Sequence, residues 1–129
     1  MEHLTREQTL RLRQRLEEEL AALGRRDEAQ RAAAREARAP DVGDRQDAAA
    51  IEAAQVTQLS LSDHERGRAR ELEAAMRRMD AGTFGICEDT GEEIPFARLW
   101  AEPTARLTVE AQELREREAS EAVELREAY

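Results

Sequence analysis

Three aspartates lie close together in a short acidic break between two long helix-forming stretches. The break runs from Pro40 to Ala49, reads PDVGDRQDAA and contains Asp41, Asp44 and Asp47. Carboxylates so placed can form charge-assisted hydrogen bonds with cationic groups of a partner. They are also compatible with a solvated turn in which Asp47 caps the following helix. The acidic spacing alone leaves both interpretations open.

The only cysteine, Cys87, is the second candidate for chemistry. One cysteine cannot form an intrachain disulfide, and a thiol nucleophile needs a general base nearby. His3 and His64 are both remote in sequence and are expected to be ordinary surface residues. Glu88 and Asp89 beside the cysteine argue against a lowered thiol pKa. We therefore expect a buried, inert thiol, no catalytic residue and no enzymatic activity.

Two long helices are expected on either side of the acidic break. Only Gly24 interrupts residues 5–38, and only Gly67 interrupts residues 48–80. Pro40 ends the first helix because it lacks a backbone N–H and disfavours helical geometry in the residue before it. So short a connection makes the two helices fold back on each other in antiparallel fashion.

Apolar residues at helical spacing mark one face of each stretch and indicate one antiparallel seam. In order, they are Leu12, Leu16, Leu20, Leu23, Ile51, Ala54, Leu61, Leu72, Ala75, Met76 and Met79. Thr5 and Gln8 have the spacing of a capping box, which predicts a helix start near Thr5. At roughly 1.5 Å per residue, each arm would be about 45–50 Å long.

Beyond the return helix, the sequence predicts a small globular core. Gly82 and Gly85 break the helix, and a short hairpin or knuckle is expected around Gly91. Nearly all the large apolar residues outside the helices gather here: Phe84, Ile86, Ile94, Phe96, Leu99, Trp100 and Leu107.

A last helix is expected from about Thr108 to Ala128, with Thr108 as its N-cap. The candidates to cover the core are Val109, Leu114, Ala111 and Ala122. The predicted fold is therefore mainly α. An antiparallel coiled-coil hairpin occupies residues 1–81, with its acidic tip near 40–49. A globular region and C-terminal helix occupy residues 82–129.

Composition and charge narrow the class of protein. Of 129 residues, 38% are charged and only 3% aromatic, which is typical of long helices rather than of an ordinary globular core. A formal net charge of −9 argues against sequence-specific DNA binding. No apolar run approaches the roughly 20 residues of a membrane helix, and the N-terminus lacks a signal-peptide pattern. We expect a cytoplasmic protein with no membrane contact.

The segment FGICEDTGEEIPFARLWAEPTARLTVEAQ, residues 84–112, resembles the zinc finger of the DksA/TraR family of bacterial RNA polymerase regulators. The matching positions are Phe84, Gly85, Cys87, Gly91, Ile94, Arg98, Leu99, Ala101, Pro103, Thr104, Ala105 and Leu107. The upstream hairpin agrees with the family's architecture, so the resemblance extends from Thr5 to about Glu118. It implies a coiled-coil hairpin joined to a zinc-finger-like globular region.

The chain departs from the family pattern at the metal site. The family's four cysteines fall on Cys87, Thr90, Thr108 and Ala111. A structural zinc site takes four sulfur or nitrogen ligands, which hydroxyls and a methyl group cannot provide. We therefore predict no zinc and a metal-free globular region, held by apolar packing and by hydrogen bonds from the two threonines.

The family also carries a D-x-x-D-x-A motif at its hairpin tip. Asp44, Asp47 and Ala49 satisfy this motif, whereas the pair Asp41 and Asp44 is followed by Gln46 where alanine is needed. The resemblance therefore implies that Asp44, Asp47 and Ala49 form the part of the tip that acts on the polymerase.

The resemblance implies a monomer that inserts its hairpin into the secondary channel of RNA polymerase and alters open-complex stability. Promoters of the ribosomal RNA type would be inhibited and others activated. The family's usual co-regulator is the alarmone ppGpp, whose phosphates call for basic residues. The aligned positions here are Glu71, Glu102 and Gln112. We expect weak or absent synergy with ppGpp.

Two other functions are compatible with the residues. A secondary-channel factor that stimulates transcript cleavage would use tip acids to hold a metal ion. A structural coiled-coil adaptor would have no role at the polymerase.

Overall fold

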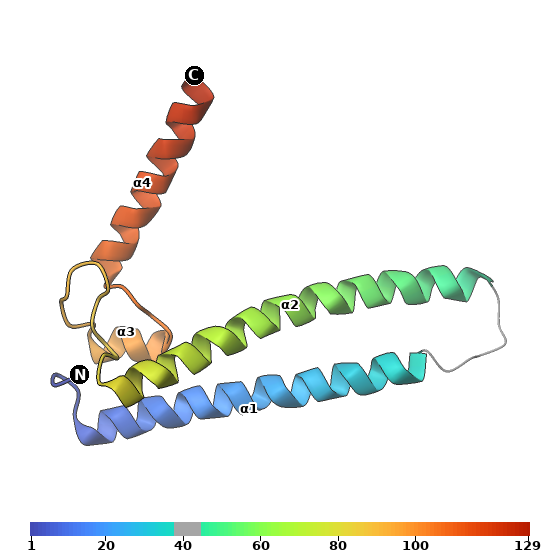
Figure 1. Ribbon diagram of the computed structural model, residues 1–129, viewed down its shortest axis with the longest axis horizontal. Helices are drawn as coiled ribbons and strands as arrows, with labels where there is room; N and C mark the ends of the chain where they lie inside the picture. The colour runs from blue at the N-terminus through green and yellow to red at the C-terminus, as the bar shows by residue number, and fades with distance from the viewer. Residues whose placement is uncertain (38–44) are drawn as a thin grey trace. The chain divides into compact units, whose positions relative to one another are not determined.

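The computed structural model describes residues 1–37 and 62–129 with their side chains, and the helical course alone of residues 45–61. It contains α1 (Arg6–Ala37), α2 (Arg45–Ala81), α3 (Phe96–Ala101) and α4 (Val109–Ala128), shown in Figure 1. An isolated antiparallel bridge joins Ile86 and Glu93. The expected mainly helical fold with a coiled-coil hairpin is confirmed. Within the described residues, no helix is both long enough and apolar enough to span a bilayer.

The first helix begins where the capping box predicts. Gln8 N donates to Thr5 Oγ1 and Thr5 N donates to Gln8 Oε1, both at 3.0 Å. Each side chain thereby satisfies a backbone N–H group that the first helical turn leaves without a partner. α1 then continues for 32 residues, or about 48 Å of helix at 1.5 Å per residue.

The chain forms two compact units, one of residues 1–15 with 74–129 and one of residues 16–73. Each unit contains a segment of α1 beside an antiparallel segment of α2 (Figure 1). The division into a hairpin and a globular region at residue 81 is a different boundary, drawn at the end of α2, and it stays a prediction.

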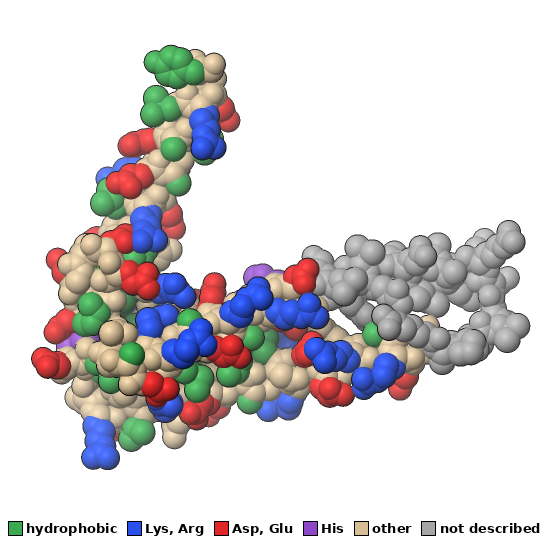
Figure 2. Space-filling view, viewed as in Figure 1, with side chains coloured by type: hydrophobic (Ala, Val, Ile, Leu, Met, Phe, Trp, Pro, Cys, Tyr) green, Lys and Arg blue, Asp and Glu red, His purple; other side chains and the backbone are tan. Residues whose placement is uncertain are grey.

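The unit of residues 16–73 is held by a narrow apolar seam and by ion pairs beside it. Leu16 and Leu72 are fully buried in this seam. Arg68 donates two hydrogen bonds to Glu19, from Nε to Oε1 at 2.8 Å and from Nη2 to Oε2 at 3.1 Å. Elsewhere, acidic and basic side chains alternate over the described surface (Figure 2).

The unit of residues 1–15 and 74–129 contains the small core. Phe84, Ile94 and Leu99 are completely buried, as the sequence predicts. Leu12 of α1 and Ala75 of α2 are also fully buried in this unit. The ends of the two long helices therefore form part of the same core as the loop that follows them.

Trp100 does not belong to the buried core, although the sequence placed it there. Its side chain is 42% exposed, with Arg15 lying 4.9 Å over the ring and Phe96 stacked at 6.0 Å. Phe96 and Trp100 both lie on α3, a six-residue helix that the sequence analysis did not predict. A helix of less than two turns is too short to establish a periodic pattern.

The last helix begins at its predicted cap. Thr108 Oγ1 accepts a hydrogen bond from Ala111 N at 3.3 Å, which confirms Thr108 as the N-cap. The expectation that Val109 and Leu114 cover the core is wrong, because they are 43% and 50% exposed. Ala111 is buried as expected, whereas every residue after it, Ala122 included, is exposed.

Two glycines of the knuckle allow a matched test of backbone strain. Gly85 and Gly91 both have positive φ, 79° and 73°, where a β-carbon is unfavourable. A β-carbon at Gly85 would also lie 3.2 Å from the His3 ring and 3.4 Å from Leu99, whereas one at Gly91 would meet nothing within 4 Å.

Gly91→Ala is therefore expected to lower the free energy of unfolding by about 1–2 kcal/mol from backbone strain alone. Gly85→Ala should lower it further, because the His3 ring and Leu99 must also move. Urea unfolding of the two variants measures this difference. An equal loss of unfolding free energy in both variants would show that the contacts around Gly85 do not contribute to the difference.

Candidate functional site

The loop after α2 folds into the knuckle that the sequence predicts around Gly91. Cys87 N donates to Glu92 O at 2.8 Å, and Gly91 N donates to Cys87 O at 2.9 Å. Ile94 N donates to Gly85 O at 2.7 Å and closes the loop from the other side. These backbone bonds place Cys87 at the turn of the knuckle, facing the start of α4.

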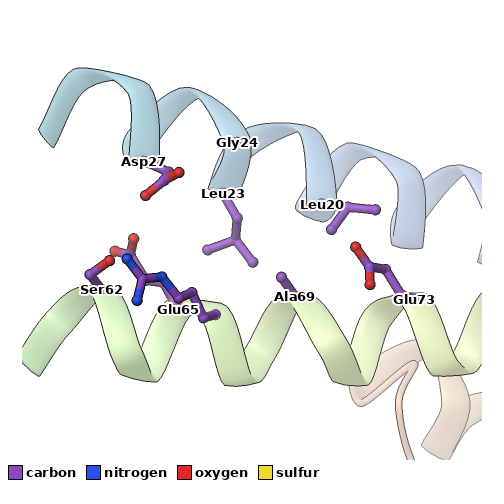
Figure 3. A pocket seen from close by; sticks show the side chains of 9 residues that line it. Leu20, Leu23, Gly24, Asp27, Ser62, Glu65, Ala69 and Glu73 are labelled. Carbon is purple, nitrogen blue, oxygen red and sulfur yellow. The ribbon is translucent and has the colours of Figure 1, made fainter. Parts of the chain in front are cut away.

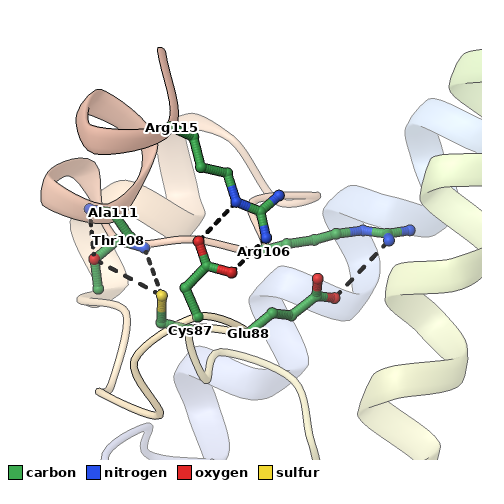
Figure 4. Close-up of polar contacts among 7 residues, drawn as sticks. Cys87, Glu88, Arg106, Thr108, Ala111 and Arg115 are labelled. Atoms are coloured by element: carbon green, nitrogen blue, oxygen red, sulfur yellow. Dashed lines mark hydrogen bonds and ion pairs between the residues drawn. The ribbon is translucent and has the colours of Figure 1, made fainter. Parts of the chain in front are cut away.

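Three of the four positions aligned with the family's cysteines, Cys87, Thr108 and Ala111, lie together in Figure 4. Cys87 is only 2% exposed. Its sulfur accepts hydrogen bonds from Thr108 N at 3.4 Å and from Thr108 Oγ1 at 3.9 Å. Ala111 N donates to the same Thr108 hydroxyl. Thr90 hydrogen bonds to the Cys87 sulfur through its side chain and accepts from Glu92 N at 3.2 Å.

This donor set does not fit zinc. It offers one sulfur, two hydroxyls and the methyl group of Ala111, and both hydroxyls take part in hydrogen bonds within the knuckle. Structural zinc sites use four deprotonated sulfur or nitrogen ligands. Within residues 1–37 and 62–129, no group of three or more His, Cys, Asp or Glu side chains is placed to hold a metal ion.

The thiol of Cys87 has an unusual environment. Burial raises its pKa, but hydrogen bonds from Thr90 and Thr108 outweigh burial and lower the pKa from 9.0 to about 7. The expectation of an ordinary thiol pKa, drawn from Glu88 and Asp89, is therefore wrong. Hydrogen-bond donors arranged around a sulfur stabilise the thiolate more than these two carboxylates disfavour it.

The lowered pKa predicts that the fold becomes more stable from about pH 7 to about pH 9. In this interval the unfolded chain keeps a proton that the folded thiolate has released, so stability rises with pH and is lost as pH falls through 7. Urea unfolding at several pH values should show this rise in the natural chain and not in Cys87→Ser. Equal pH dependence in both would contradict it.

Two ion pairs hold the knuckle against the residues around α4. Arg115 of α4 donates to both carboxylate oxygens of Asp89, from Nε to Oδ2 at 2.7 Å and from Nη2 to Oδ1. This ion pair lowers the pKa of Asp89. Arg106 lies 3.8 Å from Glu88. Neither pair was predictable from the sequence, because no local pattern links charges 26 and 18 residues apart.

The N-terminal residues also contribute to this unit. His3 Nε2 lies 2.8 Å from Ile94 O, and the side chain is half-buried, so the expectation of an ordinary surface histidine is wrong. Arg98 of α3 donates to Leu107 O at 2.8 Å and also contacts Gln112. Together these contacts fix both sides of the knuckle.

The predicted tip lies outside the part of the chain that the structure describes with side chains. Asp44 lies outside the described residues. Asp47 and Ala49 fall within α2, but their side chains lie outside the described part of the chain. The assignment of Asp44, Asp47 and Ala49 to a functional tip stays a prediction.

The knuckle and the first part of α4 match a known protein family. A family described as the prokaryotic dksA/traR C4-type zinc finger matches residues 82–117. The RNA polymerase-binding transcription factor DksA of Caulobacter vibrioides is 44% identical over 71 residues, which are 55% of this chain and 50% of that protein. The chain thus spans about half the length of this curated relative.

Two solved structures extend the likeness to the hairpin. The transcription factor DksA2 from Pseudomonas aeruginosa matches with a TM-score of 0.82 and 30% identity, over 89% of this chain and 88% of that one. The RNA polymerase binding protein and transcriptional regulator Dks from Chlamydia trachomatis matches with a TM-score of 0.52 and 26% identity, over 90% and 95%. The knuckle, the hairpin and the shared sequence agree, and the chain belongs to the DksA/TraR family.

Proposed function

We propose that the chain binds bacterial RNA polymerase and regulates transcription by inserting its hairpin into the secondary channel. The observation that carries this proposal is the match to DksA2, which includes the hairpin as well as the knuckle and covers 89% of the chain. The curated DksA relative is named for binding RNA polymerase. A net charge of −9 agrees with a partner that is protein rather than DNA.

The tip would act on the polymerase rather than on the promoter. Asp44 and Asp47 supply carboxylates that can hydrogen bond to cationic or mobile catalytic elements, and Ala49 completes the motif. A preference for one polymerase conformation shifts the populations by the difference in binding free energy, typically about 1–3 kcal/mol. The consequence is a less stable open complex and inhibition of ribosomal RNA promoters.

The proposed regulator acts without zinc and with little help from ppGpp. The Cys87 site supplies a single sulfur, and its hydrogen bonds take the place of metal coordination. Glu71, Glu102 and Gln112 occupy the positions aligned with the family's basic contacts. Two carboxylates would repel a polyphosphate rather than bind it. We propose that the protein acts as a monomer and has no catalytic activity of its own.

Multi-round transcription from a ribosomal RNA promoter, with and without ppGpp, tests the proposal. The protein should lower transcript yield on its own, and ppGpp should add little. Cleavage of the transcript in backtracked complexes would instead identify a cleavage factor. If the protein neither binds core polymerase nor alters transcription by it, the chain is not a polymerase regulator. That result would favour the structural adaptor.

A further inference from the structure

A groove opens between α1 and α2 in the unit of residues 16–73 (Figure 3). Its volume is about 290 Å³. The residues that line it are Leu20, Leu23, Gly24, Asp27, Ser62, Glu65, Arg66, Ala69 and Glu73. Most of the surface is apolar, and the charged side chains stand at its edges.

The groove exists because small residues interrupt the seam. Gly24 has no side chain, Ala69 has a single methyl group, and a β-carbon built at Gly24 would meet nothing within 4 Å. Leu20 and Leu23 remain partly exposed, because no large side chain from the opposite helix covers them here. Unfilled space beside apolar side chains forfeits packing contacts, so an occupant that supplies them would be favoured.

The charges around the groove favour a cation. Asp27 is paired with Arg31 at 3.2 Å and Arg66 with Asp63 at 3.5 Å, so Glu65 and Glu73 add two further carboxylates to the lining. Glu65 Oε2 is buried without a hydrogen-bond partner in the described part of the chain. A carboxylate oxygen withdrawn from water is destabilising until a donor reaches it. The groove therefore lacks a positive group rather than a negative one.

The size of the groove limits what can enter. Pockets for small ligands and cofactors have volumes of about 300–1,000 Å³, so this one lies at their lower limit. A single long side chain with an aliphatic stem and a cationic head combines the two properties required. Lysine and arginine bury such stems on apolar surfaces while the charge stays among polar groups.

We propose that this groove receives a lysine or arginine side chain from RNA polymerase. The aliphatic stem would lie on Leu20, Leu23 and Ala69, and the cationic head would meet the buried oxygen of Glu65. The inference rests on the proposed function, because it takes the polymerase as the partner. It adds a second contact, on the side of the hairpin and separate from the tip.

Filling the groove tests the proposal without weakening the helix. Gly24→Leu places a side chain in the groove, where the polymerase side chain would bind. Gly67→Leu is the matched control, because Gly67 lies on α2 outside the groove and a β-carbon there also meets nothing within 4 Å. Both substitutions should raise the unfolding temperature, because leucine favours helix over glycine. Only Gly24→Leu should weaken binding to core polymerase, by about tenfold or more.

Removing the charge gives an independent readout. Glu65→Gln keeps the shape and should weaken binding by about tenfold. Glu18→Gln makes the same charge change at an exposed position of α1 outside the groove and should leave binding unchanged. Both measurements use the whole chain and core polymerase.

The outcomes separate the two proposals. If the natural chain binds polymerase and Gly24→Leu binds equally well, the groove is no docking site. Equal losses in Gly24→Leu and Gly67→Leu also overturn the inference, because they would trace the effect to the helices in general. If the natural chain does not bind at all, it is the proposed function that fails.

Discussion

Asp47→Asn and Asp44→Asn are each expected to abolish inhibition of a ribosomal RNA promoter while binding to polymerase persists. The amide keeps the size of the carboxylate but loses its charge, and with it the stronger hydrogen bonds that carboxylates accept. If those bonds form preferentially in one polymerase conformation, their loss removes a coupling of about 1–3 kcal/mol, or roughly 5- to 150-fold in the conformational equilibrium. Binding should persist, because the substitutions leave the rest of the hairpin and the knuckle unchanged.

Paired assays of binding and transcription measure this separation. Glu36→Gln is the control, because it neutralises an exposed acid at the end of α1 outside the motif. It should bind and inhibit like the natural chain. Unchanged inhibition by the double variant Asp44→Asn with Asp47→Asn would show that the tip carboxylates do not act. Loss of binding in Asp47→Asn alone would assign that carboxylate to affinity rather than to regulation.

The parts of the fold that local sequence determines were predictable. Thr5 with Gln8 fixes the start of α1, and Thr108 fixes the start of α4, because a capping side chain acts on backbone groups two or three residues away. The apolar stripes predicted the hairpin, since their spacing matches the helical repeat. In the same way, Gly91 marked the turn of the knuckle, where a positive φ is required.

The parts that depend on distant residues were not predictable. His3 meets Ile94 across 91 residues of sequence, and no local pattern gives that contact. The lowered pKa of Cys87 depends on hydrogen bonds from Thr90 and from Thr108, 21 residues away, which outweigh burial and which the neighbouring acids did not suggest. The groove beside Gly24 depends on which small residues of two helices come opposite each other, and a stripe of apolar positions does not fix that alignment.

Restoring the family's cysteines is expected to create a zinc site in this knuckle. The triple variant Thr90→Cys, Thr108→Cys and Ala111→Cys should bind one zinc ion per chain. The reason is geometric, because the Cys87 sulfur and the Thr108 hydroxyl are already 3.9 Å apart. Two sulfurs of a tetrahedral site, each about 2.3 Å from zinc, are separated by about 3.8 Å. The Cys87 and Thr108 positions therefore already have the separation that two zinc ligands need.

The energies favour the metal by a wide margin. Loss of the Thr108 cap costs about 1 kcal/mol, whereas structural zinc binds with about 10–16 kcal/mol in small domains near pH 7. With zinc, the triple variant should unfold at a temperature higher by more than about 10 °C, and a chelator should reverse the gain.

The natural chain should show neither zinc binding nor any change with chelator, and adding Cys87→Ser to the triple variant should weaken zinc binding sharply. Zinc in the natural chain would contradict the metal-free assignment. Failure of the triple variant to bind would mean that the hydrogen-bonded sulfur holds the knuckle in a shape that a metal cannot use. In that case the hydrogen bonds around Cys87 would stabilise a knuckle of a different shape, and would not simply replace the bonds to zinc.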